Sequence, residues 1–423
     1  MEIMAKGRAT AWAQLPISLN QLCLATVLRC GQTFRWKASG PDEWSCGFSD
    51  RIISLRQSST HLHYRATFPP LPKSQKPKPQ EEEKEQKETL EIVKNYLNLS
   101  VDLASLYEKW SQKDPNFKRK AGEFGGVRML RQEPWECLIG FICSSNNNIS
   151  RIGQMVDKLC ATYGTPLGTI THSFGDKREE VAYHSFPSIE SLTAATVEDT
   201  LKKLGFGYRA KYIYKTACMV YHDRPVGFLE TLRDERDYKE AHAELIKFTG
   251  VGPKVADCVC LMSLDKMGAV PVDTHVWQIA TRDYKFGKGK HRSLTPAIYE
   301  AVGDLFRDLW GEEAGWAHSV LFTADLRAFS DRLENTKTSA SKKVKVEVKE
   351  EEVKVEIKEE EEEVKTEVKE EEEEAKVDVK VEEVITVVEK RARKRGVNGE
   401  VKVKAEVVVK EEVAERRTRR RRR

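Results

Sequence analysis

The pattern of hydrophobic and polar residues changes along the chain, and its first part predicts a small antiparallel sheet. Between residues 12 and about 67, apolar and polar side chains alternate in segments 32–36, 44–48 and 52–55, which Gly, Pro or Asp residues separate. Alternation with a period of two places successive side chains on opposite faces of a strand, and these separating residues favour turns. We therefore expect β structure here.

From residue 90 to residue 327 the spacing becomes helical. Apolar residues recur every three or four positions, as at Ile152, Val156 and Leu159, with Gly or Pro at the breaks. Segment 76–83 has nothing to bury and is either a solvated insertion or the lead-in to a helix. The expected fold is α+β, with an antiparallel sheet domain over residues 1–90, including this charged insertion, and a helical domain over residues 91–330.

Residues 331–423 are expected to form a low-complexity charged tail, disordered or transiently helical. Its basic clusters at 390–395 (KRARKR) and 416–423 (RRTRRRRR) fit nuclear-import or nucleic-acid-contact signals, although the tail could also be merely solvating. We expect a nuclear protein whose tail could bind import factors or other partners. A mitochondrial fraction would not be readable from the sequence.

Charge and cysteine content narrow the class of protein. The net charge of +4 falls on the part before residue 341, because residues 341–423 hold equal numbers of basic and acidic side chains. A mildly basic folded part permits nucleic-acid binding without requiring it. No apolar run approaches a membrane span, and we expect a soluble intracellular monomer. The nine scattered cysteines predict reduced core thiols, and without a Cys-x-x-Cys pair neither a zinc site nor an iron–sulfur site is expected.

The most informative segment for chemistry is 248–258 (FTGVGPKVADC), which contains Lys254. Gly250, Val251 and Gly252 can form a tight hairpin, Pro253 suits the first position of a helix, and the free amides at that start can bind a phosphate. A lysine amine is a nucleophile only when neutral, and the positive end of a helix dipole disfavours the ammonium form. The alternative is a lysine that only binds phosphate.

Asp273 favours the catalytic interpretation. It follows an apolar segment and precedes Thr274, His275 and Val276, so that it is a plausible N-cap with a fixed carboxylate. Together with Lys254 it could provide a nucleophile and an electrostatic partner for a cationic sugar transition state.

Further motifs occur in the same chain order: 31–36 (GQTFRW), 143–149 (CSSNNNI), 204–210 (LGFGYRA) and 314–322 (AGWAHSVLF). With the Lys254 and Asp273 segments, they make the chain resemble the helix-hairpin-helix DNA glycosylases with a Gly-Pro-Asp active site, and specifically the eukaryotic 8-oxoguanine DNA glycosylase/lyase family. The resemblance runs from residue 12 to about residue 327 and excludes the tail. It implies a helix-hairpin-helix body that binds damaged double-stranded DNA.

The resemblance also implies a mechanism. The oxidised guanine would be flipped out of the duplex, and Lys254 would attack the sugar C1′ and displace the base. The resulting Schiff base would permit β-elimination, which nicks the strand on the 3′ side of the lesion, while Asp273 would stabilise the positive sugar. No metal or redox cofactor is implied.

Several residues contact DNA by the same resemblance. Asn146 would fill the gap left by the flipped base. Arg151 and Arg209 would form hydrogen bonds to the unpaired cytosine of the opposite strand, and Tyr208 would insert beside that cytosine. His275 would contact a phosphate near the lesion. Taken singly, the three asparagines at 146–148 could be a helix cap, and His275 a first-turn residue.

The base pocket is implied in the same way. The carbonyl of Gly31 would accept the N7 hydrogen of oxidised guanine, Cys258, Met262 and Phe322 would form the pocket wall, and Pro271 would border the base. Without the resemblance, Gly31 could simply be a turn residue, and the wall residues could simply be side chains of the hydrophobic core.

Two departures from the family pattern stand out. The hairpin usually begins Leu-Pro-Gly, whereas this chain has Phe248-Thr249-Gly250. His318 stands where the family commonly has a glutamine that contacts the Watson–Crick edge, and an imidazole offers its donor and acceptor in different directions. Base discrimination is therefore expected to differ.

Three alternatives remain at this point. An iron–sulfur pyrimidine-lesion glycosylase is disfavoured by the missing four-cysteine cluster, and an alkyladenine type by Lys254. The third alternative is a noncatalytic DNA-binding protein in which Lys254 only binds phosphate.

Overall fold

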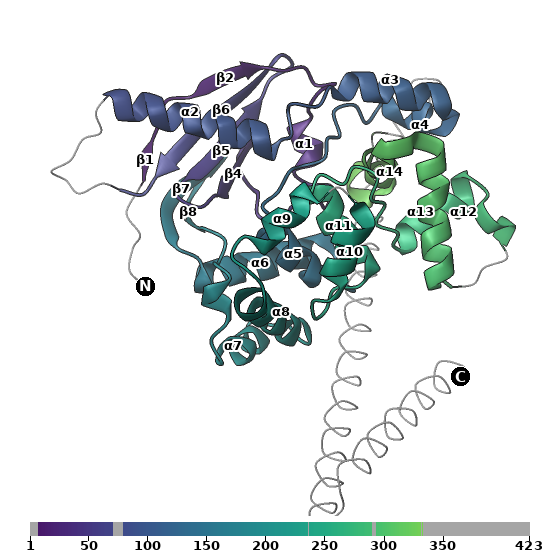
Figure 1. Ribbon diagram of the computed structural model, residues 1–423. Coiled ribbons are helices and arrows are strands. Elements are labelled where there is room, and N and C mark those ends of the chain that lie inside the picture. The colour runs from purple at the N-terminus through teal and green to yellow at the C-terminus, as the bar shows by residue number, and fades with distance from the viewer. Residues whose placement is uncertain (1–6, 71–78, 236, 290–292, 331, 333–423) are drawn as a thin grey trace, which may run out of the picture. The chain divides into compact units, whose positions relative to one another are not determined.

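An antiparallel sheet forms the N-terminal part of the chain, as its alternating pattern predicts (Figure 1). The computed structural model describes residues 7–70, 79–235, 237–289, 293–330 and 332, which all belong to one compact unit. In the sheet, the strands lie in the order β1-β6-β5-β4-β3, and β2 also pairs with β6. Their bounds are β1 Arg8–Ala9, β2 Ala13–Pro16, β3 Lys37–Gly40, β4 Glu43–Gly47, β5 Ile52–Gln57 and β6 His61–Phe68.

The strand predicted at 32–36 is wrong, since the structure has no regular element there. The buried amide of Gln32 donates to the carbonyl of Arg128 at 3.0 Å and accepts from the Leu130 amide at 3.0 Å. The ring of Phe34 packs edge-on against Phe141. The backbone carbonyl of Gln32 also accepts from the Gln132 side chain at 2.8 Å, so these contacts hold the segment to the helical body and not to a sheet ladder.

A helix follows the sheet and covers it. Helix α2 (Pro79–Tyr96) packs on β6, and its buried Val93 and Tyr96 join Leu55 and Leu62 in one apolar cluster. The structure describes residues 79–83 of segment 76–83, and these residues form the start of this helix. Of the two alternatives for the segment, this supports the lead-in to a helix and not a solvated insertion. The predicted domain boundary after residue 90 falls inside α2, and the division into domains stays a prediction.

Most of the remaining described residues form helices around a second, larger core, as predicted. Several helices begin at a side-chain cap, such as Asp114, Asn148 and Thr295, because these side chains satisfy the first free amides. The bounds are α1 Leu24–Val27, α3 Leu103–Lys113, α4 Pro115–Ala121, α5 Pro134–Cys143, α6 Ile149–Tyr163, α7 Val197–Lys203, α8 Arg209–Asp223, α9 Phe228–Asp234, α10 Tyr238–Ile246, α11 Pro253–Ser263, α12 Thr274–Asp283, α13 Pro296–Trp310 and α14 Ala314–Asp325.

One part of the predicted helical region is instead a β-hairpin. Strands β7 (Pro166–Phe174) and β8 (Lys177–His184) pair around a turn at Gly175, whose φ is +58°. The pair Gly175-Asp176 is a typical two-residue hairpin turn, and Thr169, Ile170 and Thr171 before it favour a strand, which outweighs the weak helical spacing here. Leu167 and Tyr183 pack with Ile52, so the hairpin is anchored against the sheet.

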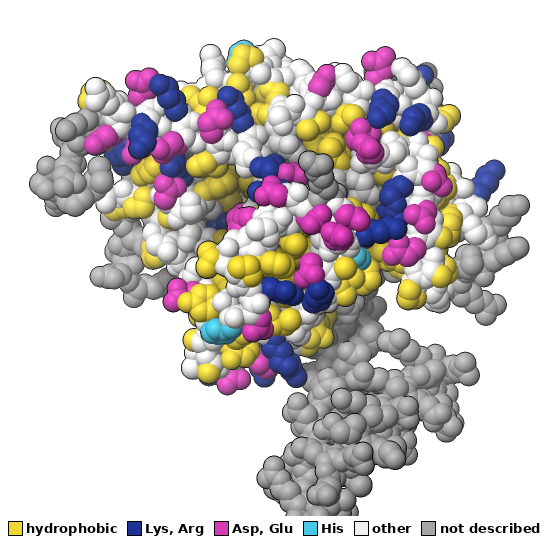
Figure 2. Space-filling view, viewed as in Figure 1, with side chains coloured by type: hydrophobic (Ala, Val, Ile, Leu, Met, Phe, Trp, Pro, Cys, Tyr) yellow, Lys and Arg dark blue, Asp and Glu magenta, His cyan; other side chains and the backbone are white. Residues whose placement is uncertain are grey.

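The expectations about the tail and nuclear import fall on residues outside those described. Among the described residues, no helix combines the length and the apolar character needed to cross a membrane. Basic and acidic side chains are interspersed over the face seen in Figure 2. That face therefore gives no charge signal for a binding site, and the chemistry must be located from individual residues.

Candidate active site

The predicted hairpin lies between α10 and α11. Gly250 has φ +81°, and a Cβ atom there would lie 2.5 Å from the ring of Tyr212, so only glycine fits. Gly252 has φ −96° and open space around it, and Pro253 is the first residue of α11. The hairpin thus needs a glycine at Gly250, while exposed Gly252 leaves the start of α11 accessible to a ligand.

Lys254 lies in the first turn of α11 and is half-buried. Its Nζ donates to Ser144 Oγ at 3.2 Å and lies 5.2 Å from the centre of the Phe141 ring. Ser144 Oγ in turn donates to the Phe141 carbonyl at 2.8 Å, which leaves its lone pairs directed to the lysine. Sequence reasoning did not assign a role to Ser144 or Phe141, because both lie far from Lys254 along the chain.

Asp273 is the N-cap of α12, as predicted: its Oδ1 accepts from the Val276 amide at 2.9 Å. Its charge acts on two further predicted site residues. Burial is the main cause that raises the pKa of the Cys258 thiol to about 12, and Asp273 raises it further whereas Lys254 lowers it. Asp273 also raises the pKa of His318 against a larger effect of burial. Lys254, Asp273, Cys258 and His318 therefore share one electrostatic environment.

The other predicted wall residues come from the same elements. Met262 lies one turn after Cys258 on α11, and both are buried. Phe322 lies one turn after His318 on α14, and their ring centres are 6.5 Å apart. Pro271 is buried just before Asp273. The structure thus places Met262 on the helix that carries Lys254 and Cys258, and Phe322 on the helix that carries His318.

His318 is buried, and its hydrogen bonding defines its tautomer. Nδ1 lies 3.1 Å from the carbonyl of Gly315, which can only accept, so Nδ1 carries the hydrogen. Burial lowers the pKa of His318, and the Gly315 carbonyl and Asp273 oppose this shift. A neutral imidazole with Nδ1 protonated presents Nε2 as an acceptor.

The Asn146 loop joins α5 to α6. Asn146 is exposed with φ +47°, whereas Asn148 caps α6 by accepting from the Arg151 amide at 2.8 Å. The cap and the exposed amide are therefore two different asparagines. Arg209 is fully buried, and its Nη2 donates to the Asn146 carbonyl at 2.8 Å. The hydroxyl of Tyr208 donates to the Ser145 carbonyl at 3.1 Å.

Two predicted residues lie at the edges of this region. Gly31 has φ +84°, a left-handed conformation that favours glycine, and a Cβ there would approach the Ile149 side chain to 3.0 Å. It therefore lies against the start of α6. His275 is exposed on the first turn of α12, with its ring 6.1 Å from that of Phe322.

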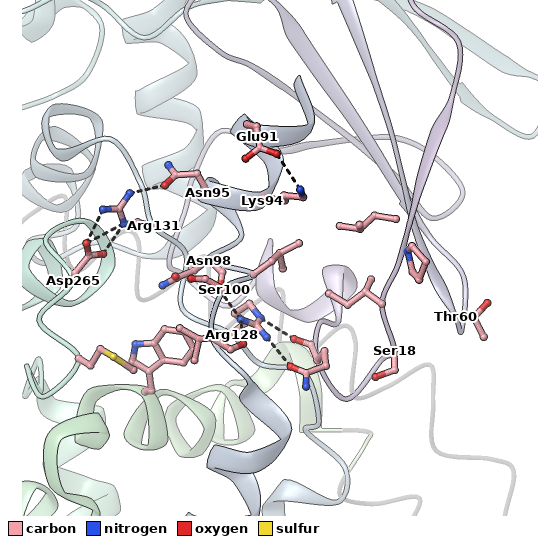
Figure 3. Close-up of a pocket in the computed structure, with 18 of the residues that line it drawn as sticks. Ser18, Thr60, Glu91, Lys94, Asn95, Asn98, Ser100, Arg128, Arg131 and Asp265 are labelled. Carbon is pink, nitrogen blue, oxygen red and sulfur yellow. Dashed lines mark hydrogen bonds and ion pairs between the residues drawn. The ribbon is translucent and has the colours of Figure 1, made fainter. Parts of the chain in front are cut away.

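A cavity of about 1170 Å³ lies elsewhere, between α2 and the far end of α11 (Figure 3). Four of its charged side chains form ion pairs with one another: Arg131 with Asp265 at 2.8 Å and Lys94 with Glu91 at 3.0 Å. None of the predicted site residues lines it. The predicted nucleophile Lys254 and its predicted partner Asp273 both lie outside this cavity.

Comparison with known families matches both the sheet part and the helical body of the chain. Residues 14–138 match the family described as 8-oxoguanine DNA glycosylase, N-terminal domain, and residues 139–302 match the HhH-GPD superfamily of base excision DNA repair proteins. The chain is 40% identical over 321 residues to the N-glycosylase/DNA lyase OGG1 of Arabidopsis thaliana, covering 75% of this chain and 81% of the relative. It is 36% identical over 373 residues to the N-glycosylase/DNA lyase of Saccharomyces cerevisiae, covering 79% and 90%.

Solved structures of 8-oxoguanine glycosylase/lyases have a similar fold. The apo-form 8-oxoguanine glycosylase/lyase of Clostridium acetobutylicum is similar with a TM-score of 0.60 and 25% identity, covering 76% of this chain and 99% of that one. The same enzyme in complex with double-stranded DNA containing cytosine opposite 8-oxoG is similar with a TM-score of 0.58 and 26% identity, covering 74% and 93%.

The matches extend through both the sheet and the helical body and include the segment that carries Lys254 and Asp273. A purely DNA-binding role is thereby excluded in favour of an enzyme. The chain belongs to the 8-oxoguanine DNA glycosylase family of helix-hairpin-helix base excision repair proteins, binds DNA, and combines N-glycosylase with DNA lyase activity.

Proposed function

We propose that the enzyme excises 8-oxoguanine opposite cytosine by attack of the Lys254 amine on C1′ of the flipped nucleoside. The observation that carries this proposal is the position of Lys254 at the exposed start of α11, between the Ser144 hydroxyl and the Phe141 ring. An amine held at a helix start beside a fixed carboxylate has the arrangement that covalent glycosylase chemistry requires. The Clostridium complex with cytosine opposite 8-oxoG supports the same substrate.

The proposed reaction has two stages. The lone pair of the Lys254 nitrogen forms a bond to C1′ while the bond from C1′ to the base breaks, and the departing base takes the electron pair and then the proton that the lysine nitrogen releases. Opening of the sugar ring gives a Schiff base. Loss of a C2′ proton then breaks the C3′–O bond and nicks the strand on the 3′ side.

Asp273 stabilises the positive charge that develops on the sugar. Its Oδ1 is held by the Val276 amide, so the carboxylate is fixed before the reaction begins. A preorganised charge stabilises a transition state without the cost of reorienting it.

Recognition of the base falls to the pocket residues. The Gly31 carbonyl accepts the N7 hydrogen that distinguishes the lesion, and Cys258, Met262, Pro271 and Phe322 enclose the base. His318 presents the Nε2 acceptor, which suits the N1–H or amino group of a guanine-type edge. At N1 an adenine-type edge has an acceptor in place of the N1–H donor, and the Nε2 acceptor of His318 would repel that atom.

The opposite strand and the backbone are held by the remaining residues. Asn146 fills the vacated gap, Tyr208 wedges beside it, and Arg151 and Arg209 act on the cytosine. The bonds from Arg209 to the loop carbonyls support a role in shaping the Asn146 loop.

The phosphate contacts lie at two helix starts. The hairpin at Gly250, Val251 and Gly252 and the exposed side chain of His275 contact phosphates of the damaged strand, although the Val251 amide itself donates to the Phe248 carbonyl at 3.2 Å. The exposed positions of Gly252 and His275 support this assignment.

Borohydride trapping tests the proposal. A duplex with 8-oxoguanine opposite cytosine should give a covalent adduct with the wild type and with Lys247→Gln, which removes an exposed lysine nearby. Lys254→Gln should bind the duplex but give neither adduct nor nick. Base release at the wild-type rate by Lys254→Gln would contradict the mechanism, and equal trapping with adenine opposite the lesion would contradict the assigned pairing.

We also propose that the basic tail clusters direct the protein to the nucleus. A reporter fused to residues 390–423 should accumulate there, and a reporter that remains cytoplasmic would refute this assignment.

A further inference from the structure

Asp257 is a buried carboxylate that the proposed mechanism does not use. It lies one turn after Lys254 on α11, and only 1% of its surface is exposed. Burying a charged carboxylate is costly unless hydrogen bonds compensate for the lost water. Its surroundings must therefore supply those bonds.

Two phenols and one imidazole surround this carboxylate. Tyr238, on α10, donates its hydroxyl hydrogen to Oδ1, and Tyr299, on α13, donates to Oδ2. His242 Nε2 lies 3.5 Å from Oδ1. Asp257 thus connects α11 to both α10 and α13.

Two members of this cluster also contact the backbone next to the two proposed catalytic residues. The Tyr299 hydroxyl accepts from the amide of Val272, next to Asp273, at 3.4 Å. His242 Nε2 lies 3.3 Å from the carbonyl of Pro253, next to Lys254. Because that carbonyl and Asp257 can only accept, His242 Nε2 carries a hydrogen that the two share.

We infer that Asp257 is a positioning residue, which with Tyr299 and His242 fixes the backbone before Lys254 relative to the backbone before Asp273. This inference rests on the proposed roles of those two residues. A displacement of about 1 Å between reacting groups can slow an enzyme by about a hundredfold without weakening substrate binding. The DNA-contacting loop at Asn146 receives no hydrogen bond from this cluster among the described residues.

The hydrogen bonding of this cluster depends on pH, because Asp257 can gain a proton. Burial raises the pKa of Asp257 to about 6, while His242, the two phenols and Arg307 oppose the shift. Burial and the Asp257 charge also raise the pKa of Tyr238 and of Tyr299, so both phenols keep their hydrogens. The carboxylate is therefore ionised at neutral pH and accepts both bonds, and it loses that capacity when the solution becomes more acidic.

Tyr299→Phe and Tyr238→Phe form a matched pair for the test. Each removes one hydroxyl from Asp257, but only Tyr299 also bonds Val272. Single-turnover base release from an 8-oxoguanine duplex should fall about tenfold in Tyr299→Phe and in Asp257→Asn, and less than about threefold in Tyr238→Phe. The Kd for a duplex with an uncleavable abasic analogue should stay within about twofold for all three.

A pH profile separates positioning from a merely structural role. Beyond the loss expected from protonation of any amine nucleophile, the wild-type rate should show an additional fall as the pH drops through about 6, and Asp257→Asn should lack this additional fall. A wild-type rate in Tyr299→Phe, equal losses in both phenol variants, or an unchanged acid limb in Asp257→Asn would overturn the inference.

Lys254→Gln provides the reference for the underlying mechanism. If it abolishes trapping while Tyr299→Phe behaves as wild type, the positioning role fails and the proposed function stands. If Lys254→Gln reacts at the wild-type rate, the proposed function itself fails.

Discussion

The guanidinium of Arg209 donates to the backbone carbonyl of Asn146 at 2.8 Å and also to the carbonyl of Ser145. Arg209 is fully buried, whereas Asn146 is exposed in a left-handed conformation with φ +47°. A residue on α8 thereby holds the loop that carries the exposed amide. Charge-assisted bonds of this kind are stronger than neutral ones and fix the direction of the loop.

Arg209→Lys should therefore destabilise the protein, because a lysine cannot reproduce the forked contact with two carbonyls. We expect the free energy of unfolding to fall by about 2 kcal/mol, measured by denaturant titration. Binding to a duplex with cytosine opposite an abasic analogue should weaken as well. An unchanged denaturation midpoint would show that the loop holds its shape without Arg209.

The two hairpin glycines should respond differently to alanine. Gly250→Ala places a Cβ 2.5 Å from the Tyr212 ring in a left-handed conformation, so we expect a loss of about 2 kcal/mol in stability. Gly252→Ala meets no atom within 4 Å and should fold normally. Its added methyl group should weaken DNA binding only if the backbone of a ligand approaches there. Equal melting temperatures for both variants would contradict the hairpin geometry.

Ser144→Ala should slow base release, because it removes the acceptor that holds Lys254 Nζ at 3.2 Å. A hydrogen bond worth about 1 kcal/mol corresponds to a rate loss of about fivefold. Ser145→Ala is the matched control, since it retains the carbonyl that Arg209 contacts. Single-turnover kinetics check the prediction, and identical rates for the two variants would exclude Ser144 from positioning the amine.

The titration of His318 should contribute to acid lability. Because burial lowers its pKa below the ordinary value of 6.5, the unfolded chain binds this proton more readily than the folded chain. The stabilising contribution is present above about pH 6.5 and is lost as the pH falls toward the lower folded-state pKa. His318→Gln should lose less stability than the wild type between about pH 7 and pH 5, measured by the denaturation midpoint. Parallel pH curves for the two proteins would contradict this assignment.

His318→Gln should also change base selectivity. The amide can donate as well as accept, whereas neutral His318 offers only the Nε2 acceptor toward the base. We expect the ratio of 8-oxoadenine to 8-oxoguanine release to rise by about tenfold, corresponding to about 1.4 kcal/mol. An unchanged ratio would indicate that this edge is not recognised at position 318.

The sequence by itself determined the features that depend on neighbouring residues. The tight turn at Gly250, the start of α11 at Pro253 and the N-cap role of Asp273 all follow from local backbone preferences. Cys258 shares the face of Lys254 because helix geometry alone brings positions four apart together. The alternating strands and the family motifs likewise lie in contiguous segments.

The tertiary structure decided which distant side chains meet. Ser144 reaches Lys254 only because α5 packs against α11, and the Arg209 clamp requires α8 beside the Asn146 loop. Helical spacing concealed the hairpin at Gly175, although its turn signal was present in the chain. In the sequence, Asp257 is one polar residue in a largely apolar helix, and its partners Tyr238 and Tyr299 come from α10 and α13. Such contacts depend on how element faces pack in three dimensions, and local preferences carry no information about that packing.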